Sequence, residues 1–81
     1  MEGTPLAFEK EINQTKLLLI KMGLNEYQAS ALAHLILIGE TKPTTLSKTS
    51  GVPSARIYGV LNELAKMGLV ITRPGRPILY R

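Results

Sequence analysis

Four glycines stand where helices of this 81-residue sequence would end, and they constrain the fold more than any other feature. Each follows a helix-compatible segment directly, and a glycine just past the last turn is a common helix stop. The four are Gly23, Gly39, Gly51 and Gly68. They predict four short helices, at about 6–22, 26–38, 45–50 and 53–67.

Residues that favour helix starts support the same division. Asn25 can cap the second predicted helix and Thr44 the third, because their side-chain oxygens can accept hydrogen bonds from backbone N–H groups of the first turn. Pro53 falls in or just before the first turn of the fourth helix, where its missing N–H does no harm.

After the last glycine stop, the pattern becomes that of a hairpin. Three β-branched residues at 70–72 predict a strand over 69–73, and the Pro-Gly pair that follows predicts a turn before a returning strand over 78–81. The third and fourth helices are joined by a tight glycine turn, as in helix-turn-helix units. The predicted fold is therefore a single domain over 1–81, mainly α with a small β-hairpin: a winged helix-turn-helix.

The charge is divided unevenly along the chain. Residues 1–40 hold three lysines and five glutamates, a net charge of −2, whereas residues 41–81 hold seven basic residues and one acid, a net charge of +6. This asymmetry favours a polyanionic partner for the C-terminal half, although a basic surface with no partner would have the same composition.

The helix predicted at 53–67 has two different sides at about 100° per residue. Its core side is apolar and consists of Ile57, Val60, Leu61 and Leu64. Its outer side consists of Ala55, Gly59, Asn62 and Lys66. Arg56 and Glu63 border the outer side on one edge, and Tyr58 borders it on the other.

Ala55 and Gly59 leave the N-terminal half of this outer side nearly flat, although glycine inside a helix costs about 1 kcal/mol relative to alanine. A recognition helix enters the major groove with its N-terminal residues leading, so a flat line there lets the backbone approach closely. Ser54, Arg56 and Tyr58 would then reach bases or phosphates on either side. Two alternatives for the pair of small residues stay open: a small-residue face against another helix, and a surface glycine without a role.

The predicted hairpin adds a separate basic feature. Arg73 and Arg76 flank its turn, where arginines can enter a minor groove or contact phosphates. The full predicted set also includes two threonines at the start of the short helix. The predicted DNA-contacting residues are Thr44, Thr45, Ser54, Ala55, Arg56, Tyr58, Gly59, Asn62, Arg73 and Arg76.

From about Thr15 to Arg81 the sequence resembles the DNA-binding domain of the archaeal TrmB-type transcriptional regulators. The resemblance is carried by "MGLNEYQASALAHLILIG" (22–39), "LSKTSGVPSARIYGVLNELAKMGLV" (46–70) and "GRPILYR" (75–81), in the family's order. It implies a winged-helix, sequence-specific binder of double-stranded DNA, usually dimeric, with Ser54, Arg56 and Tyr58 in the reading helix and Arg76 in the wing. Many relatives carry an acidic or larger polar residue where Gly59 stands. Larger members continue into a C-terminal sugar-binding domain, whereas this sequence stops after the wing, so a small-molecule effector is not expected.

Two apolar runs, LLLI at 17–20 and LILI at 35–38, bear on oligomeric state. Four consecutive helical residues sweep about 300°, more than one buried face can cover. We therefore predict a homodimer with the helix at about 6–22 in the interface. The alternative is that this helix is buried on two sides within one chain.

Several classes of function lack support in the sequence. There is no cysteine, and His34 is the single histidine, so neither a metal cluster nor a thiol nucleophile is indicated. We predict no enzyme, no cofactor and no metal. The apolar runs are far shorter than a membrane span of about 20 residues, and the N-terminus lacks the apolar segment of a signal peptide, so a cytoplasmic protein is expected. Tyr27, spaced at helical intervals from Ala31 and Leu35, is predicted to pack in the core.

The sequence thus predicts a homodimeric transcriptional regulator that reads double-stranded DNA through helix 53–67 in the major groove and the wing at about 69–81. Two alternatives remain from other classes. One is a winged-helix module that binds an acidic protein, and the other is an architectural DNA binder with little sequence preference.

Overall fold

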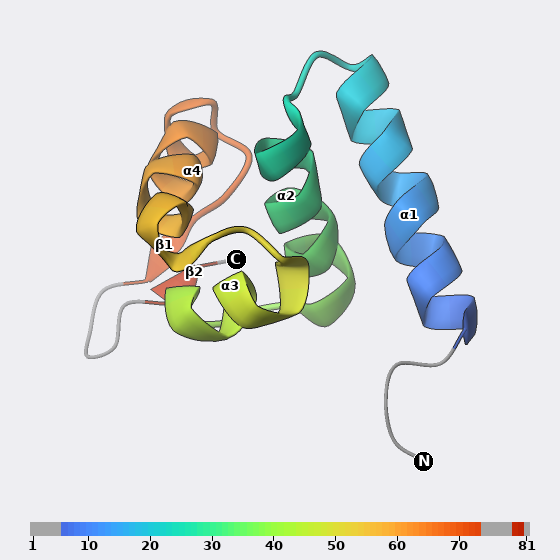
Figure 1. Cartoon of the computed structure of the whole chain (residues 1–81). Helices are drawn as coiled ribbons and strands as arrows, with labels where there is room; N and C mark the ends of the chain where they lie inside the picture. Colours follow the sequence, from blue (N-terminus) through green and yellow to red (C-terminus); the bar gives the residue numbers. More distant parts are fainter. Residues whose placement is uncertain (1–5, 74–78, 81) are drawn as a thin grey trace.

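The computed structural model describes residues 6–73 and 79–80 (Figure 1). Within these ranges the chain forms four helices and two short strands. They are α1 (Leu6–Lys21), α2 (Glu26–Ile38), α3 (Pro43–Ser50), α4 (Ser54–Lys66), β1 (Thr72–Arg73) and β2 (Leu79–Tyr80). The predicted order of elements and the mainly α fold class are confirmed.

The helices surround one small core. In Figure 1, α2 lies between α1 on one side and α4 on the other, with α3 across the base of the pair α2 and α4. α1 packs against α2, whereas α2, α3 and α4 all pack against one another. The largest side chains that are fully buried come from α3, α4 and the turn between them: Leu46, Val52, Ile57, Leu61 and Leu64.

The glycine stops fall where the sequence predicts them. All four have a positive φ, and Gly51, at 81°, lies in the left-handed region and donates its N–H to Ser47 O as it ends α3. Only glycine adopts this conformation without strain from a Cβ. The turn into α4 is therefore determined by Gly51.

The helix starts agree with the sequence in two of three cases. Asn25 caps α2 in a reciprocal arrangement: its Oδ1 accepts from the N–H of Gln28 at 2.8 Å, and Gln28 Oε1 accepts from the N–H of Asn25 at 3.1 Å. Pro53 is the N-cap of α4. The predicted cap at Thr44 is wrong, because α3 begins earlier, at Pro43, whose fixed φ suits a first helical residue without a side-chain cap.

The two strands pair antiparallel, with Thr72 opposite Tyr80 and Arg73 opposite Leu79. β1 is shorter than the strand predicted over 69–73, and residues 78 and 81 of the predicted returning strand lie outside the described residues. The predicted turn at 74–77 lies outside the described residues. No helix within the described ranges has the length and apolar character that crossing a membrane requires.

Candidate nucleic-acid interface

α4 presents the two sides that its periodicity predicts. Ile57, Val60, Leu61 and Leu64 are all buried in the core. The outer line of α4, which consists of Ala55, Gly59, Asn62 and Lys66, is exposed along its whole length. The same core contacts that hold α4 in place thus turn this line toward solvent.

The N-terminal half of the outer line, at Ala55 and Gly59, has no side chain larger than a methyl group. An added Cβ at Gly59 would meet no atom within 4 Å among the described residues. Within the described part of one chain, therefore, no helix packs against Gly59. Among the described residues, a contact between Gly59 and another helix of the same chain is excluded, and a contact with a second copy stays open.

The two edges of the outer line differ. Tyr58 borders one edge and is 52% exposed. On the other edge, the guanidinium carbon of Arg56 lies over the ring of Tyr27, 5.6 Å from its centroid. On that same edge, two turns further along α4, Gln28 Nε2 donates a hydrogen bond to Glu63 Oε1 at 2.9 Å. The first turn of α2 is thus attached to the Arg56 edge of α4.

Tyr27 is the residue that sequence reasoning placed wrongly. It is 37% exposed, whereas Ala31 and Leu35, the residues at helical spacing from it, are buried. Tyr27 belongs to the first turn of α2, which the core does not cover. Its ring contacts the guanidinium group of Arg56 instead of a core side chain. A tyrosine near a helix start, opposite an arginine near another, is the signal that could have indicated this contact.

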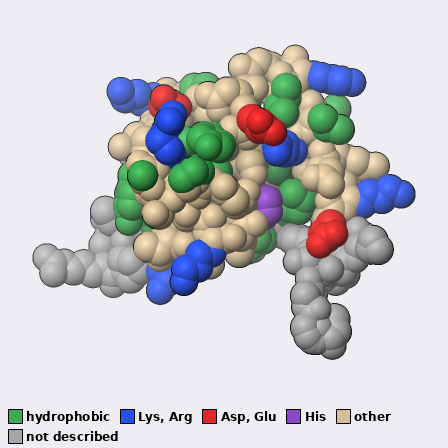
Figure 2. All heavy atoms as spheres, viewed as in Figure 1, with side chains coloured by type: hydrophobic (Ala, Val, Ile, Leu, Met, Phe, Trp, Pro, Cys, Tyr) green, Lys and Arg blue, Asp and Glu red, His purple; other side chains and the backbone are tan. Residues whose placement is uncertain are grey.

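α3, which directly precedes α4 in the sequence, has exposed polar residues that could belong to the same interface. Thr44 and Thr45, both in the predicted set, are exposed in its first turn, and so is Lys48, which the prediction did not include, in its last. On the face shown in Figure 2, the Lys and Arg side chains lie apart from one another around the molecule and do not form one patch. The feature of the candidate interface that the structure locates is the low relief of α4 at Ala55 and Gly59.

The predicted wing residues are only partly located. The backbone of Arg73 pairs with Leu79 in the two-stranded sheet, and Arg76 lies outside the described residues. Their contact with DNA stays a prediction.

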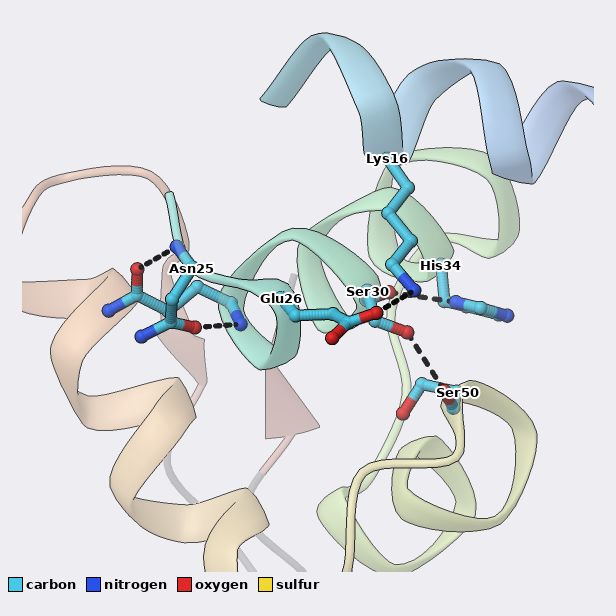
Figure 3. Close-up of polar contacts among 7 residues, drawn as sticks. Lys16, Asn25, Glu26, Ser30, His34 and Ser50 are labelled. Carbon is cyan, nitrogen blue, oxygen red and sulfur yellow. Dashed lines mark hydrogen bonds and ion pairs between the residues drawn. The ribbon is translucent and has the colours of Figure 1, made fainter. Parts of the chain in front are cut away.

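The single histidine has a structural contact. His34 Nδ1 lies 2.8 Å from Ser30 O, and Ser30 Oγ donates to Ser50 O, also at 2.8 Å (Figure 3). His34 also borders an open hollow of about 710 Å³ between α1, α2 and α3, which includes none of the predicted DNA-contacting residues. Among the described residues, no group of three or more side chains is placed to hold a metal ion.

Comparison with known proteins agrees with this arrangement. The family described as sugar-specific transcriptional regulator TrmB matches residues 18–81. The HTH-type sugar sensing transcriptional regulator TrmBL1 of Pyrococcus furiosus is 43% identical over 72 residues, which is 89% of this chain and 20% of that protein.

A solved structure is also similar. The structure of TrmBL2, titled as an archaeal chromatin protein with a novel mode of DNA binding, superposes with a TM-score of 0.78 at 37% identity. The match covers 86% of this chain and 27% of that one, so the chain spans only about a quarter or less of either relative. Because the family match runs from the end of α1 through the sheet, and the helices have the arrangement of a solved TrmB-type protein, the chain belongs to the TrmB family of transcriptional regulators.

Proposed function

We propose that this chain recognises a specific sequence of double-stranded DNA as a homodimer, with α4 in the major groove, and that it regulates transcription in this way. The observation that carries the proposal is the low relief of the N-terminal half of the outer line of α4. A Cβ added at Gly59 would meet no described atom within 4 Å beyond its chain neighbours and the backbone of its own helix. A major groove about 12 Å wide admits a helix, and a helix with only small residues at its leading end, such as Ala55 and Gly59, can approach it closely.

The residues around the line suit the contacts that such a helix makes. Ser54 lies in the first turn, and Arg56 and Tyr58 project from the two edges. Arginine can donate two hydrogen bonds to a guanine edge or to a phosphate, while serine and tyrosine can reach phosphates or bases. We assign Thr44 and Thr45, at the exposed start of α3, to backbone contacts beside the groove.

A second copy of the chain is the occupant that we propose for the outer face of α1. Leu17 and Leu18 are 59% and 61% exposed, so the packing of α1 on α2 leaves both largely uncovered. Two copies related by twofold symmetry would place two α4 helices on DNA half-sites of the same sequence. The target is then an inverted repeat.

One observation favours a second candidate function. TrmBL2, whose structure is similar, is titled a chromatin protein. Architectural binding with little sequence preference would use the same α4 surface with contacts mainly to phosphates. The sugar sensing in the name of TrmBL1 belongs to a protein of which this chain spans a fifth, and we propose DNA binding alone for this chain.

Selection of bound duplexes from a random pool, at fixed salt and at a second, higher salt concentration, separates these functions. Enrichment of an inverted repeat supports the sequence-specific regulator. Uniform recovery supports the architectural binder. No recovery at either salt concentration overturns both and leaves the protein-interaction module. Lys10→Ala, which removes one positive charge from α1, is the control for a general effect of net charge.

A further inference from the structure

Arg56 and Tyr27 form a contact between two elements that the DNA-binding function alone does not explain. The guanidinium carbon lies over the ring, 5.6 Å from its centroid, within the distance of about 6 Å at which a ring face attracts a cation. The guanidinium N–H groups lie in the plane of the group, so a ring against one face leaves them available at its edges.

The backbone that carries the ring is held in place by its neighbours. Tyr27 is the second residue of α2 and lies inside the capping box that Asn25 and Gln28 form, two residues before the buried Ala29. Gln28 also donates to Glu63 on α4, and Glu26 pairs with Lys16 of α1 at 3.4 Å (Figure 3). The first turn of α2 is therefore attached to both neighbouring helices, and Tyr27 can serve as a platform.

A ring that supports an exposed arginine side chain reduces the number of conformations that this side chain adopts before binding. A free arginine side chain loses much of its conformational entropy when it is ordered. A side chain that is already oriented in the free protein loses less on binding, so its hydrogen bonds contribute more to affinity.

We propose that Tyr27 is a positioning residue for DNA binding: its ring holds the Arg56 guanidinium at the edge of α4, directed toward a pair of acceptor atoms on DNA. The pair is either O6 and N7 of a guanine or two oxygens of a phosphate. This inference rests on the proposed function and adds to it a residue that acts without touching DNA.

A double-mutant cycle tests the inference. Tyr27→Leu removes the ring and keeps an apolar side chain, and Tyr27→Phe keeps the ring. Each is combined with native Arg56 and with Arg56→Ala, and the dissociation constant for a selected duplex is measured by fluorescence anisotropy. We expect Tyr27→Leu to weaken binding about two- to fivefold, the size of an exposed cation–π contact, and Tyr27→Phe to bind as the wild type does. In the Arg56→Ala background, Tyr27→Leu should have no further effect.

The same variants distinguish the two sources of acceptor atoms. If Arg56 contacts guanine, Tyr27→Leu relaxes the preference at one base pair, as Arg56→Ala does. If Arg56 contacts a phosphate, both variants weaken binding to all duplexes and reduce the dependence of affinity on salt.

The inference is overturned if Tyr27→Leu binds as the wild type does, if Tyr27→Phe is as weak as Tyr27→Leu, or if the leucine effect persists without Arg56. Circular dichroism monitors the fold of each variant. Should Tyr27→Leu unfold, Arg56→Lys makes the test from α4, because it keeps the charge and loses the planar group; unchanged binding by Arg56→Lys would overturn the inference. A wild-type protein that binds no duplex overturns the proposed function as well, whereas wild-type binding that ignores Tyr27 overturns the positioning role alone.

Discussion

At the scale of single residues, Gly59 is the clearest case of a position whose surroundings follow from sequence. Its exposure is determined by the apolar residues on the other side of α4, and helical periodicity locates that side without any tertiary information. The structure confirms the result: Ile57 and Leu61 are buried, and within the described ranges no atom of another element lies within 4 Å of a Cβ added at Gly59.

Gly59→Ala should raise the free energy of unfolding by up to about 1 kcal/mol, because the helix gains propensity and no neighbour obstructs the methyl group. Gly59→Leu should keep the helix and lower DNA affinity, because its bulk prevents close approach to the groove. Urea titration measures the first effect and anisotropy the second. Gly59→Ala is the matched control for Gly59→Leu at the same site.

The leucine variant also separates the three roles open to Gly59. Lost DNA binding by a stable dimer supports the groove. Loss of the dimer would instead indicate a helix contact between copies. Full binding by Gly59→Leu would show that the glycine has no part in recognition.

Several contacts between residues could not be predicted from sequence. Whether Arg56 meets Tyr27, or Glu63 meets Gln28, depends on how α2 and α4 cross, and periodicity within one helix contains no information about crossing. Helical spacing gave Tyr27 a core position because it ignores where a helix emerges from the core. The outer line of α4 was predictable, and its attachment to α2 was not.

At the scale of elements, the ends of the helices were more predictable than their starts. A helix that ends at a glycine does so because glycine can adopt a positive φ. All four glycines predicted to end helices have a positive φ in the structure. Starts are less distinct, because both a capping side chain and a proline at the first position can begin a helix. That ambiguity explains why α3 begins at Pro43 and not after Thr44.

The turn between α3 and α4 depends on a hydrogen bond from outside the motif. Ser30, buried in α2, donates from Oγ to Ser50 O at 2.8 Å. Ser30→Ala should lower the free energy of unfolding by about 1–3 kcal/mol, because it leaves a carbonyl of the turn without this donor. Urea denaturation measures the change.

Thr49→Ala is the matched control for Ser30→Ala. Thr49 is exposed, and its hydroxyl donates to two carbonyls of its own helix, Thr45 O and Leu46 O. Its loss should change stability by less than about 0.5 kcal/mol. Equal effects of the two variants would contradict a special role for Ser30 at the turn.

For the predicted wing, the expectation that arginines contact DNA rests on the sequence. If Arg73 and Arg76 contact phosphates, each should contribute about 0.9 to the slope of log K against log salt. The double variant Arg73→Ala with Arg76→Ala should therefore weaken binding to all sequences and flatten that slope. Lys10→Ala with Lys21→Ala, which removes the same charge from α1, is the control, and an unchanged slope in the wing variant would remove the wing from the phosphate contacts.

At the scale of the whole molecule, each of the two apolar runs is divided between core and surface. Ile36 and Ile38, in the second run, are 57% and 47% exposed. Leu35, in the second run, is a core residue, because α2 lies between α1 and the other helices. Leu17 and Leu18, in the first run, remain exposed, so the described chain does not bury α1 on two sides. Composition alone could not show which residues of each run are buried, because every residue in both runs is apolar.

Substitutions in α1 should separate association from folding. Leu18→Glu should reduce dimer formation and leave the monomer folded, because Leu18 is 61% exposed. Leu19→Glu should destabilise the fold itself, because Leu19 is partly buried against the core. Sedimentation velocity over a range of concentrations measures the first effect and thermal unfolding the second. A wild-type protein that stays monomeric as its concentration rises would contradict the homodimer.

The packing of α1 also determines how often this helix opens and exposes its amides to solvent. Among its described side chains, Ile12 is buried and Leu19 packs on the core, while most of the remainder face solvent. Detaching α1 therefore exposes far less apolar surface than unfolding α2, α3 and α4, and its amides should exchange with solvent through a local opening of low free energy. Within the proposed dimer, each opening also requires release of the second copy, so exchange slows as the protein becomes more concentrated. The time that α1 stays packed on the rest of the chain then depends on the protein concentration.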